Sequence, residues 1–256
     1  MTELPRRAAL AGALAAMAAL AGCGIAGRDA GPPPRVFIAG DSTASAYPPE
    51  RAPRQGWGQA LGERFDPRVV VVNRAVSGRS TRSFIDEGHW DRLVAELVPG
   101  DWVLIQFGHN DQKAEDPRRF ADPATTYREN LARFVRDVRA RGAHPVLLTS
   151  VARRRFRDGR MVDTHGAWPP AMKSVAAADG VPLLDIDAIT RARFTALGEE
   201  GSKRHYLHVT AAEGFPAYPE GAADDTHFRA EGARLVAGMV AEAIRDAGLP
   251  LARWLR

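Results

Sequence analysis

Short apolar, β-branched runs recur along the chain and alternate with longer amphipathic segments. The runs lack a strict alternation of apolar and polar residues, which is typical of strands buried on both faces of a sheet. The five runs are Arg35–Ala39, Val69–Val72, Trp102–Phe107, Pro145–Ser150 and Pro182–Ile186. Helical patterns lie between and after them, at Trp57–Phe65, Trp90–Leu97, Ala124–Arg141, Ala167–Ala178, Asp187–Leu197 and Ala230–Ala247. This alternation predicts one α/β domain over residues 35–256, a flavodoxin-like three-layer α/β/α sandwich around a five-stranded parallel sheet.

The first 34 residues differ in composition from this domain. Arg6 and Arg7 precede an apolar run from Ala8 to Gly22, which is shorter than the roughly 18 residues that a membrane-spanning helix requires. A positive start followed by a short apolar core is typical of an export signal. We therefore expect residues 1–22 to be a signal peptide.

Cys23, the only cysteine of the chain, directly follows Leu20-Ala21-Gly22. This arrangement resembles a bacterial lipobox, in which the cysteine is lipidated and becomes the new N-terminus. The resemblance implies a lipoprotein that contacts the membrane only through its anchor, with residues 23–34 as a proline-rich tether. An ordinary secretory peptide with an incidental cysteine is the alternative.

Composition and charge exclude few function classes. Charged residues make up 26% of the chain and hydrophobic residues 45%, as in an ordinary globular protein. The net charge of +4 arises from 35 basic residues interleaved with 31 acidic ones, so no nucleic-acid partner is expected. The P-loop and the G-x-S-x-G elbow are absent from the sequence, which disfavours kinases and α/β-hydrolases. His205 and His208 lack a completing ligand pattern, so we expect no metal site.

Three predicted strands are each followed by a loop of small and polar residues. These loops are Gly40-Asp41-Ser42-Thr43, Asn73–Ser80 and Gly108-His109-Asn110-Asp111. The carboxyl ends of parallel strands share one edge of a sheet, and ligands bind in the crevice outside that edge. The topology therefore brings the three loops together at one site.

Residues for acyl transfer can be assembled at this edge. Ser42 is a candidate nucleophile, and His227 is a candidate base that Asp224, three residues earlier in an expected loop, would orient. The backbone N–H groups of Ser42 and Gly78 and the side chain of Asn110 would stabilise an oxyanion. Read singly, Ser42 and Asn110 could be helix caps and Gly78 a turn glycine.

Taken together and in this order, the motifs resemble those of the SGNH (GDSL-type) hydrolases. Further motifs are similar to the rhamnogalacturonan acetylesterase family in particular: Gly56-Trp57-Gly58, Gly78–Phe84, Leu104–Asp111, Asp163–Gly166 and Tyr218–Gly221. The resemblance runs from about Arg35 to the C-terminus. It implies a serine esterase that removes O-acetyl groups from a pectin-like or rhamnogalacturonan-like poly- or oligosaccharide, through an acyl-enzyme and without a cofactor.

Other polar residues on the same edge are candidates for substrate contacts: Asp41, Thr43, Arg79, His109, Asp111, Arg154 and His165. The basic run Arg153–Arg160 follows the fourth predicted strand and could pair with galacturonate carboxylates, or could be a solvated loop. Asp163 and His165 are expected to brace a loop or to touch substrate. Trp57, Trp90 and Trp168 could form the floor of a sugar site, although core packing explains a tryptophan more often.

Two other functions stay open at this point. Another SGNH esterase, such as a lysophospholipase or a peptidoglycan O-acetylesterase, is compatible with a lipid anchor. A non-catalytic carbohydrate-binding lipoprotein would keep the fold but would lack a reactive Ser42.

Overall fold

The computed structural model describes residues 32–256. The predicted signal peptide, the lipidation site at Cys23 and nearly all of the predicted tether lie outside the described residues. None of the helices formed by residues 32–256 combines the length and the apolar character that crossing a bilayer requires.

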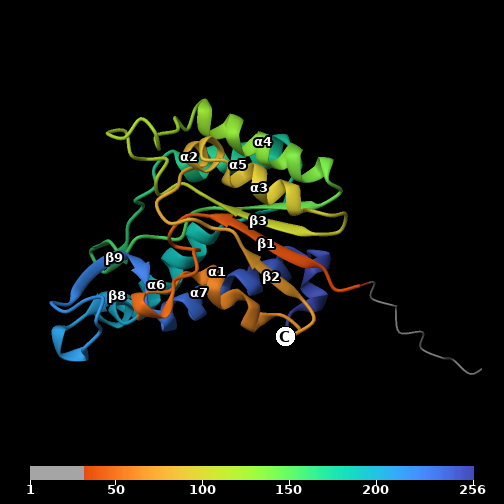
Figure 1. Cartoon of the computed structure of the whole chain (residues 1–256). Helices are drawn as coiled ribbons and strands as arrows, with labels where there is room; N and C mark the ends of the chain where they lie inside the picture. The colour runs from red at the N-terminus through yellow and green to blue at the C-terminus, as the bar shows by residue number, and fades with distance from the viewer. Residues whose placement is uncertain (1–31) are drawn as a thin grey trace, which may run out of the picture. The chain divides into compact units, whose positions relative to one another are not determined.

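A five-stranded parallel sheet forms the centre of the domain (Figure 1). Its strands lie in the order β2 (Val70–Asn73), β1 (Arg35–Gly40), β3 (Trp102–Gln106), β4 (His144–Leu148) and β7 (Leu183–Leu184). The chain moves from β1 to β2 on one side and then crosses to β3 on the other, so the strand order reverses between β1 and β3. In such folds the ligand site lies at this switch point. The predicted α/β architecture is confirmed.

Helices cover both faces of the sheet, as Figure 1 shows. One face carries α1 (Trp57–Ala60), α6 (Ile186–Lys203) and α7 (Ala230–Asp246), and the other carries α2 (Thr81–Asp86), α3 (His89–Glu96), α4 (Thr126–Ala140) and α5 (Trp168–Ala178). Single 3₁₀ turns complete the connections at Pro49–Arg51, Leu61–Arg64, Ala211–Glu213 and Pro250–Trp254.

The alternation of side chains along β1 explains the two apolar cores. Val36 and Ile38 join the core beneath α1 and α7, while Phe37 and Ala39 join the core beneath α2 to α5. All four side chains are fully buried. A strand that is apolar at every position is therefore what a sheet covered on both faces requires.

The structure corrects the sequence-based picture in three places. Val70 in β2 is 54% exposed, because β2 is an edge strand and is not buried on both faces as predicted. The segment expected to form one helix over Trp57–Phe65 is a single α-turn followed by a 3₁₀ turn. Asp224 and His227, expected in a loop, lie in strand β9 (Ala222–Phe228).

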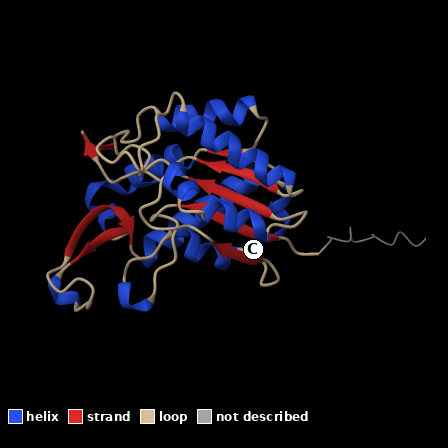
Figure 2. Cartoon of the chain, turned by 45° about the horizontal axis from the view of Figure 1, so that its top comes forward, coloured by secondary structure: helices blue, strands red, loops and turns tan. Residues whose placement is uncertain are grey.

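Strand β9 pairs with β8 (Tyr206–Val209) in an antiparallel hairpin that the sequence pattern did not indicate. Figure 2 shows this hairpin as a curved ribbon separate from the five-stranded sheet. A second small hairpin joins β5 (Phe156–Arg157) to β6 (Arg160–Met161). β9 is polar and only partly buried, so it carries little of the hydrophobic periodicity by which strands are recognised.

Candidate active site

Ser42, His227 and Asp224 form a continuous line of hydrogen-bonding atoms. Ser42 Oγ lies 2.8 Å from His227 Nε2, and His227 Nδ1 lies 2.7 Å from Asp224 Oδ2. Ser42 follows β1, whereas Asp224 and His227 lie in β9. His227 is 185 positions after Ser42 in the chain. The fold thus brings together a hydroxyl, an imidazole and a carboxylate in the order that nucleophilic catalysis requires.

Local backbone geometry fixes the Asp224 carboxylate. Its Oδ1 accepts the backbone N–H groups of Thr226 at 2.8 Å and of His227 at 3.0 Å, which leaves Oδ2 for the imidazole. Burial raises the pKa of Asp224, but the hydrogen bonds and the charge interaction with His227 outweigh this and hold that pKa well below its usual value. The carboxylate therefore stays ionised and sets the imidazole with Nδ1–H toward Asp224 and the Nε2 lone pair toward Ser42.

The loop that carries Ser42 is held from within by Asp41. Asp41 Oδ1 accepts the backbone N–H of Thr43 at 2.9 Å and its hydroxyl at 2.8 Å, and Oδ2 lies 3.2 Å from His109 Nδ1. Thr43 in turn contacts Gln106 at the end of β3. Asp41, Thr43 and His109 are buried, and their contacts in the structure are with protein groups. They shape the serine loop.

His109 is neutral at physiological pH. Burial lowers its pKa to about 4, although the nearby Asp41 carboxylate opposes that change. The loop that carries Ser42 therefore rests on a buried carboxylate and an uncharged imidazole.

The two further loops supply the candidate oxyanion donors. Gly78 adopts a positive φ of 82°, and a Cβ placed there would meet no atom within 4 Å, so the space that a side chain would fill at this position is open. Asn110 Nδ2 donates to the carbonyl of Arg79 at 3.0 Å. Because an amide nitrogen carries two hydrogens, Asn110 keeps a second one for a ligand. The Arg79 guanidinium binds Glu87 and the carbonyl of Ser77.

Asp111 is directed into the protein. Its Oδ1 accepts the backbone N–H of Thr81 at 2.9 Å and the Thr81 hydroxyl at 2.6 Å, at the N-terminus of α2. Burial raises the pKa of this carboxyl to about 7, against the effect of the Thr81 hydrogen bonds. Asp111 therefore joins the third loop to α2.

Arg154 and His165 are also buried. Arg154 is 5% exposed, and its guanidinium donates to Asp225 Oδ1 at 2.9 Å, to Ser202 Oγ and to the carbonyl of Glu199. His165 Nδ1 lies 3.2 Å from Asp187 Oδ1 and its ring meets His109 edge to face. Both residues were predicted to touch substrate, and the structure places both against protein partners.

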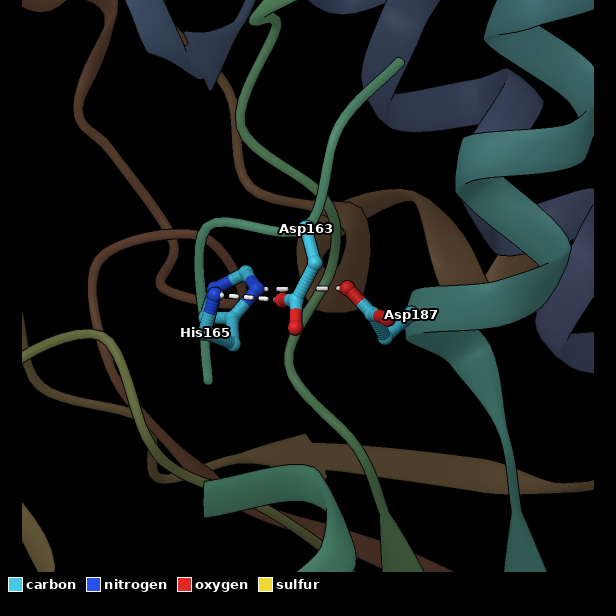
Figure 3. A group of neighbouring side chains, drawn as sticks. All are labelled: Asp163, His165 and Asp187. Carbon is cyan, nitrogen blue, oxygen red and sulfur yellow. Dashed lines mark hydrogen bonds and ion pairs between the residues drawn. The ribbon is translucent and has the colours of Figure 1, made fainter. Parts of the chain in front are cut away.

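Asp163, His165 and Asp187 offer ligand atoms within 4.8 Å of one another (Figure 3). Asp163 Oδ1 accepts the backbone N–H groups of His165 and Gly166, while Asp187 Oδ2 accepts from Arg191 at 2.8 Å. These bonds engage both oxygens of Asp187 and Oδ1 of Asp163, and the arrangement braces the loop before α5. It matches the loop-brace interpretation of the Asp163 motif, and we assign no metal to it.

Several contacts at the site have no signal in the sequence. The Tyr47 hydroxyl donates to the Ser42 carbonyl at 2.7 Å, and Arg153 donates to the carbonyls of His109 and Thr164. His208 Nε2 lies 2.8 Å from Asp225 Oδ1, the same oxygen that Arg154 contacts. Most of these pairs join residues 11 to 44 positions apart, and none has a spacing that a helix or strand pattern would reveal.

The tryptophans do not form an exposed floor. Trp57 and Trp90 are fully buried, and their indole N–H groups donate to Gln106 and Asp137. The partly buried Trp168 donates to the carbonyl of Ala121. Core packing accounts for these three side chains.

Comparison with known proteins places this geometry in context. The chain is 46% identical over 220 residues to rhamnogalacturonan acetylesterase RhgT of Bacillus subtilis (strain 168), covering 86% of this chain and 93% of the relative. It is 37% identical to the probable rhamnogalacturonan acetylesterase YesY of the same organism, covering 84% and 94%.

Solved structures share the fold at lower identity. Protein YXIM of Bacillus subtilis superposes with a TM-score of 0.73 at 24% identity, covering 85% of this chain and 58% of that one. The acetylxylan esterase Axe2 of Geobacillus stearothermophilus gives a TM-score of 0.58 at 16% identity, covering 86% and 96%.

The sequence profile of the GDSL-like Lipase/Acylhydrolase family matches residues 38–235, a range that includes the serine loop, both donor loops and strand β9. With the two relatives above, this match shows that the chain belongs to the GDSL-like lipase/acylhydrolase family and is a carboxylic ester hydrolase.

Proposed function

We propose that the protein removes O-acetyl groups from a rhamnogalacturonan-like polysaccharide, with Ser42 as nucleophile, His227 as general base and Asp224 as its partner. The observation that carries this proposal is the 2.8 Å contact between Ser42 Oγ and His227 Nε2 in a chain 46% identical to a rhamnogalacturonan acetylesterase. The named relatives supply the substrate class.

The reaction starts when His227 Nε2 takes the Ser42 proton while Oγ attacks the acetyl carbonyl carbon. The N–H groups of Ser42 and Gly78 and the free amide hydrogen of Asn110 stabilise the resulting oxyanion, each by about 3 kcal/mol in the transition state. Asp224 stabilises the imidazolium that forms. His227 then protonates the departing sugar oxygen, which leaves an acetyl ester on Ser42.

Deacetylation repeats the same steps with water. His227 removes a proton from the water molecule as its oxygen attacks the acetyl-serine carbonyl, and the same three donors hold the second oxyanion. Ser42 leaves with the proton that His227 carries, and acetate is released. One water molecule is consumed for each acetate released, and His227 carries every proton that moves.

The test is release of acetate from acetylated rhamnogalacturonan by the wild type and by Ser42→Ala. We expect Ser42→Ala to lower kcat by at least about 10⁴-fold, as loss of a triad nucleophile does. Ser174→Ala, a serine on the exposed side of α5, is the matched control and should match the wild type. Turnover by Ser42→Ala close to that of the wild type would exclude the mechanism.

Other substrates and a covalent probe separate this function from another SGNH esterase activity and from a non-catalytic binding protein. A lysophospholipase would prefer long-chain p-nitrophenyl esters to p-nitrophenyl acetate, and a peptidoglycan O-acetylesterase would release acetate from peptidoglycan instead. A non-catalytic binding protein would give no covalent adduct between Ser42 and a fluorophosphonate probe.

We further propose that the protein is exported and anchored through Cys23, which follows an apolar run and the triplet Leu20-Ala21-Gly22. Lipidation is tested by incorporation of radiolabelled palmitate in a bacterial host. The label should be lost in Cys23→Ser, and a wild type that takes up no label overturns this part of the proposal.

A further inference from the structure

Residues 47–55 run between the serine loop and α1, and they contact the strand that carries the candidate base. The backbone N–H of Gln55 donates to the Phe228 carbonyl at 3.0 Å, and Phe228 directly follows His227 in the chain. Arg54 pairs with the residue after Phe228 in an isolated antiparallel bridge. Segment 47–55 is therefore attached, at its far end, to the end of β9.

Tyr47, at the other end of segment 47–55, holds the serine loop. Its hydroxyl donates to the Ser42 carbonyl at 2.7 Å. Gln59 fixes the Tyr47 backbone in turn, because Oε1 accepts the Tyr47 N–H at 2.9 Å and Nε2 donates to the Tyr47 carbonyl at 3.3 Å. The Arg54 guanidinium lies over the Tyr47 ring, 4.5 Å from the ring centroid. One aromatic side chain thus connects Ser42 to the part of the segment that pairs with β9.

The backbone is held on both sides of the Ser42 Cα. On one side, the Asp41 carbonyl accepts the backbone N–H of Ser45 at 3.0 Å and its hydroxyl at 2.8 Å. On the other side, the Thr43 N–H donates to Asp41 Oδ1 at 2.9 Å. The Tyr47 hydroxyl holds the carbonyl of the same peptide group. The contact from Tyr47 differs from the others, because it ties this turn to a segment that also reaches β9.

The Tyr47 hydroxyl also lies close to the second donor loop. Burial raises the pKa of Tyr47, while the Ser77 side chain and the Arg54 guanidinium oppose that change. Ser77 directly precedes Gly78, whose N–H is a candidate oxyanion donor. The phenol therefore stays protonated near neutral pH and keeps its hydrogen for the Ser42 carbonyl.

We propose that Tyr47 is a positioning residue for the attack by Ser42, and that it holds the serine loop at the distance from His227 at which Oγ passes its proton to Nε2. The assignment rests on the proposed function. Tyr47 acts through the Ser42 backbone and takes no part in proton transfer. A displacement of about 1 Å at reacting atoms can cost on the order of 100-fold in rate, so this role affects turnover more than affinity.

The test is Tyr47→Phe, which removes the hydroxyl and keeps the ring beneath Arg54. We expect kcat on acetylated rhamnogalacturonan to fall about tenfold, with KM within about twofold of the wild type. The rate at which a fluorophosphonate probe labels Ser42 should fall by about the same factor, because that reaction needs the same nucleophile and base but no sugar. Tyr47→Leu, which also removes the ring, should lower both quantities further.

Tyr206→Phe is the matched control. The Tyr206 hydroxyl donates to the Ala152 carbonyl at 2.8 Å, so this variant also loses one bond from a tyrosine to a backbone carbonyl, but in the core and not at the serine loop. It should lower Tm and leave kcat and the labelling rate near those of the wild type. Arg54→Met keeps the Tyr47 hydroxyl and removes the cation above the ring, so we expect a smaller loss of labelling rate, about threefold.

The remaining outcomes overturn the assignment. Wild-type kcat and labelling rate in Tyr47→Phe would show that the hydroxyl does not position Ser42. A higher KM on the polysaccharide with an unchanged labelling rate would make Tyr47 a substrate contact instead. Equal losses of kcat in Tyr47→Phe and Tyr206→Phe would reduce the effect to general stability. A wild type that the probe does not label at Ser42 overturns the proposed mechanism, and the role of Tyr47 with it.

Discussion

Arg154 and Asp225 join the segment after β4 to strand β9 through two hydrogen bonds. Arg154 donates its backbone N–H to the Asp225 carbonyl at 2.7 Å, and its guanidinium donates to Asp225 Oδ1 at 2.9 Å. Asp225 is the direct neighbour of Asp224 and lies two positions before His227. The position of Asp224 and His227 therefore depends on a side chain that contacts neither Ser42 nor the candidate oxyanion donors.

Arg154→Met should lower both stability and turnover. The change leaves Asp225, whose side chain is 26% exposed, with His208 alone, and loss of such a hydrogen-bonded partner costs about 1–3 kcal/mol. We expect a lower Tm and a lower kcat on p-nitrophenyl acetate, with partial recovery in Arg154→Lys. Arg155→Met, at the exposed neighbouring arginine, is the control and should match the wild type. An Arg154→Met enzyme with wild-type Tm and kcat would show that the pair does not position β9.

Asp224→Asn should lower kcat by roughly 10⁴-fold, because an amide does not fix the imidazole tautomer that Ser42 needs. The substitution also has a signature in pH. The folded-state pKa of Asp224 is lowered, so its contribution to stability is present above about pH 4 and is lost as the pH falls through the folded value. Scanning calorimetry should show the Tm difference between wild type and variant shrinking below about pH 4.

Asp246→Asn, an exposed carboxylate at the end of α7, is the control for this titration. It should have little effect on kcat. A Tm difference between wild type and Asp224→Asn that grows toward low pH would contradict the lowered pKa.

Asp111→Asn should flatten the pH dependence of stability between about pH 4 and pH 7. The folded-state pKa of Asp111 is raised to about 7, so the wild type has the full benefit of this group below its unfolded pKa near 4 and loses it as the pH rises toward 7. An asparagine mimics the protonated acid and can still accept from Thr81 through Oδ1. Urea unfolding at pH 5 and pH 7 measures the free energy of unfolding of both proteins. If this free energy changed equally between the two pH values in the wild type and in Asp111→Asn, the prediction would be refuted.

Gly78→Ala should weaken catalysis beyond its effect on folding. Its φ of 82° makes an alanine cost roughly 1–2 kcal/mol, and the added methyl group would enter open space at the candidate oxyanion loop, where it would obstruct a bound substrate. Gly180→Ala is the control, since it also has a positive φ and free space but lies before β7, at the opposite edge of the sheet. We expect similar losses in Tm but a higher KM on polysaccharide for Gly78→Ala alone. If Gly78→Ala and Gly180→Ala had the same KM on polysaccharide, Gly78 would not be part of the substrate site.

The strands were predictable because their pattern is local. All five strands of the sheet lie at the predicted runs with bounds shifted by at most two residues, since a doubly covered parallel sheet demands continuous apolar sequence. The sequence pattern does not predict the hairpin of β8 and β9. Its polar strand Ala222–Phe228 owes its conformation to pairing with β8 and to the Arg154–Asp225 bonds, neither of which is written in local periodicity.

The sequence by itself determined the alternation of strands and helices, and with it the edge at which Ser42, Gly78 and Asn110 gather, because right-handed parallel crossovers leave few other arrangements. Only the tertiary structure decided which polar residues face that edge and which face inward. Asp41, Thr43, Arg154 and His165 have the chemistry of substrate contacts, yet each is buried and bonded to partners distant in the chain or fixed by the loop. A polar residue type states what a side chain can bind, whereas packing of remote segments decides what it does bind.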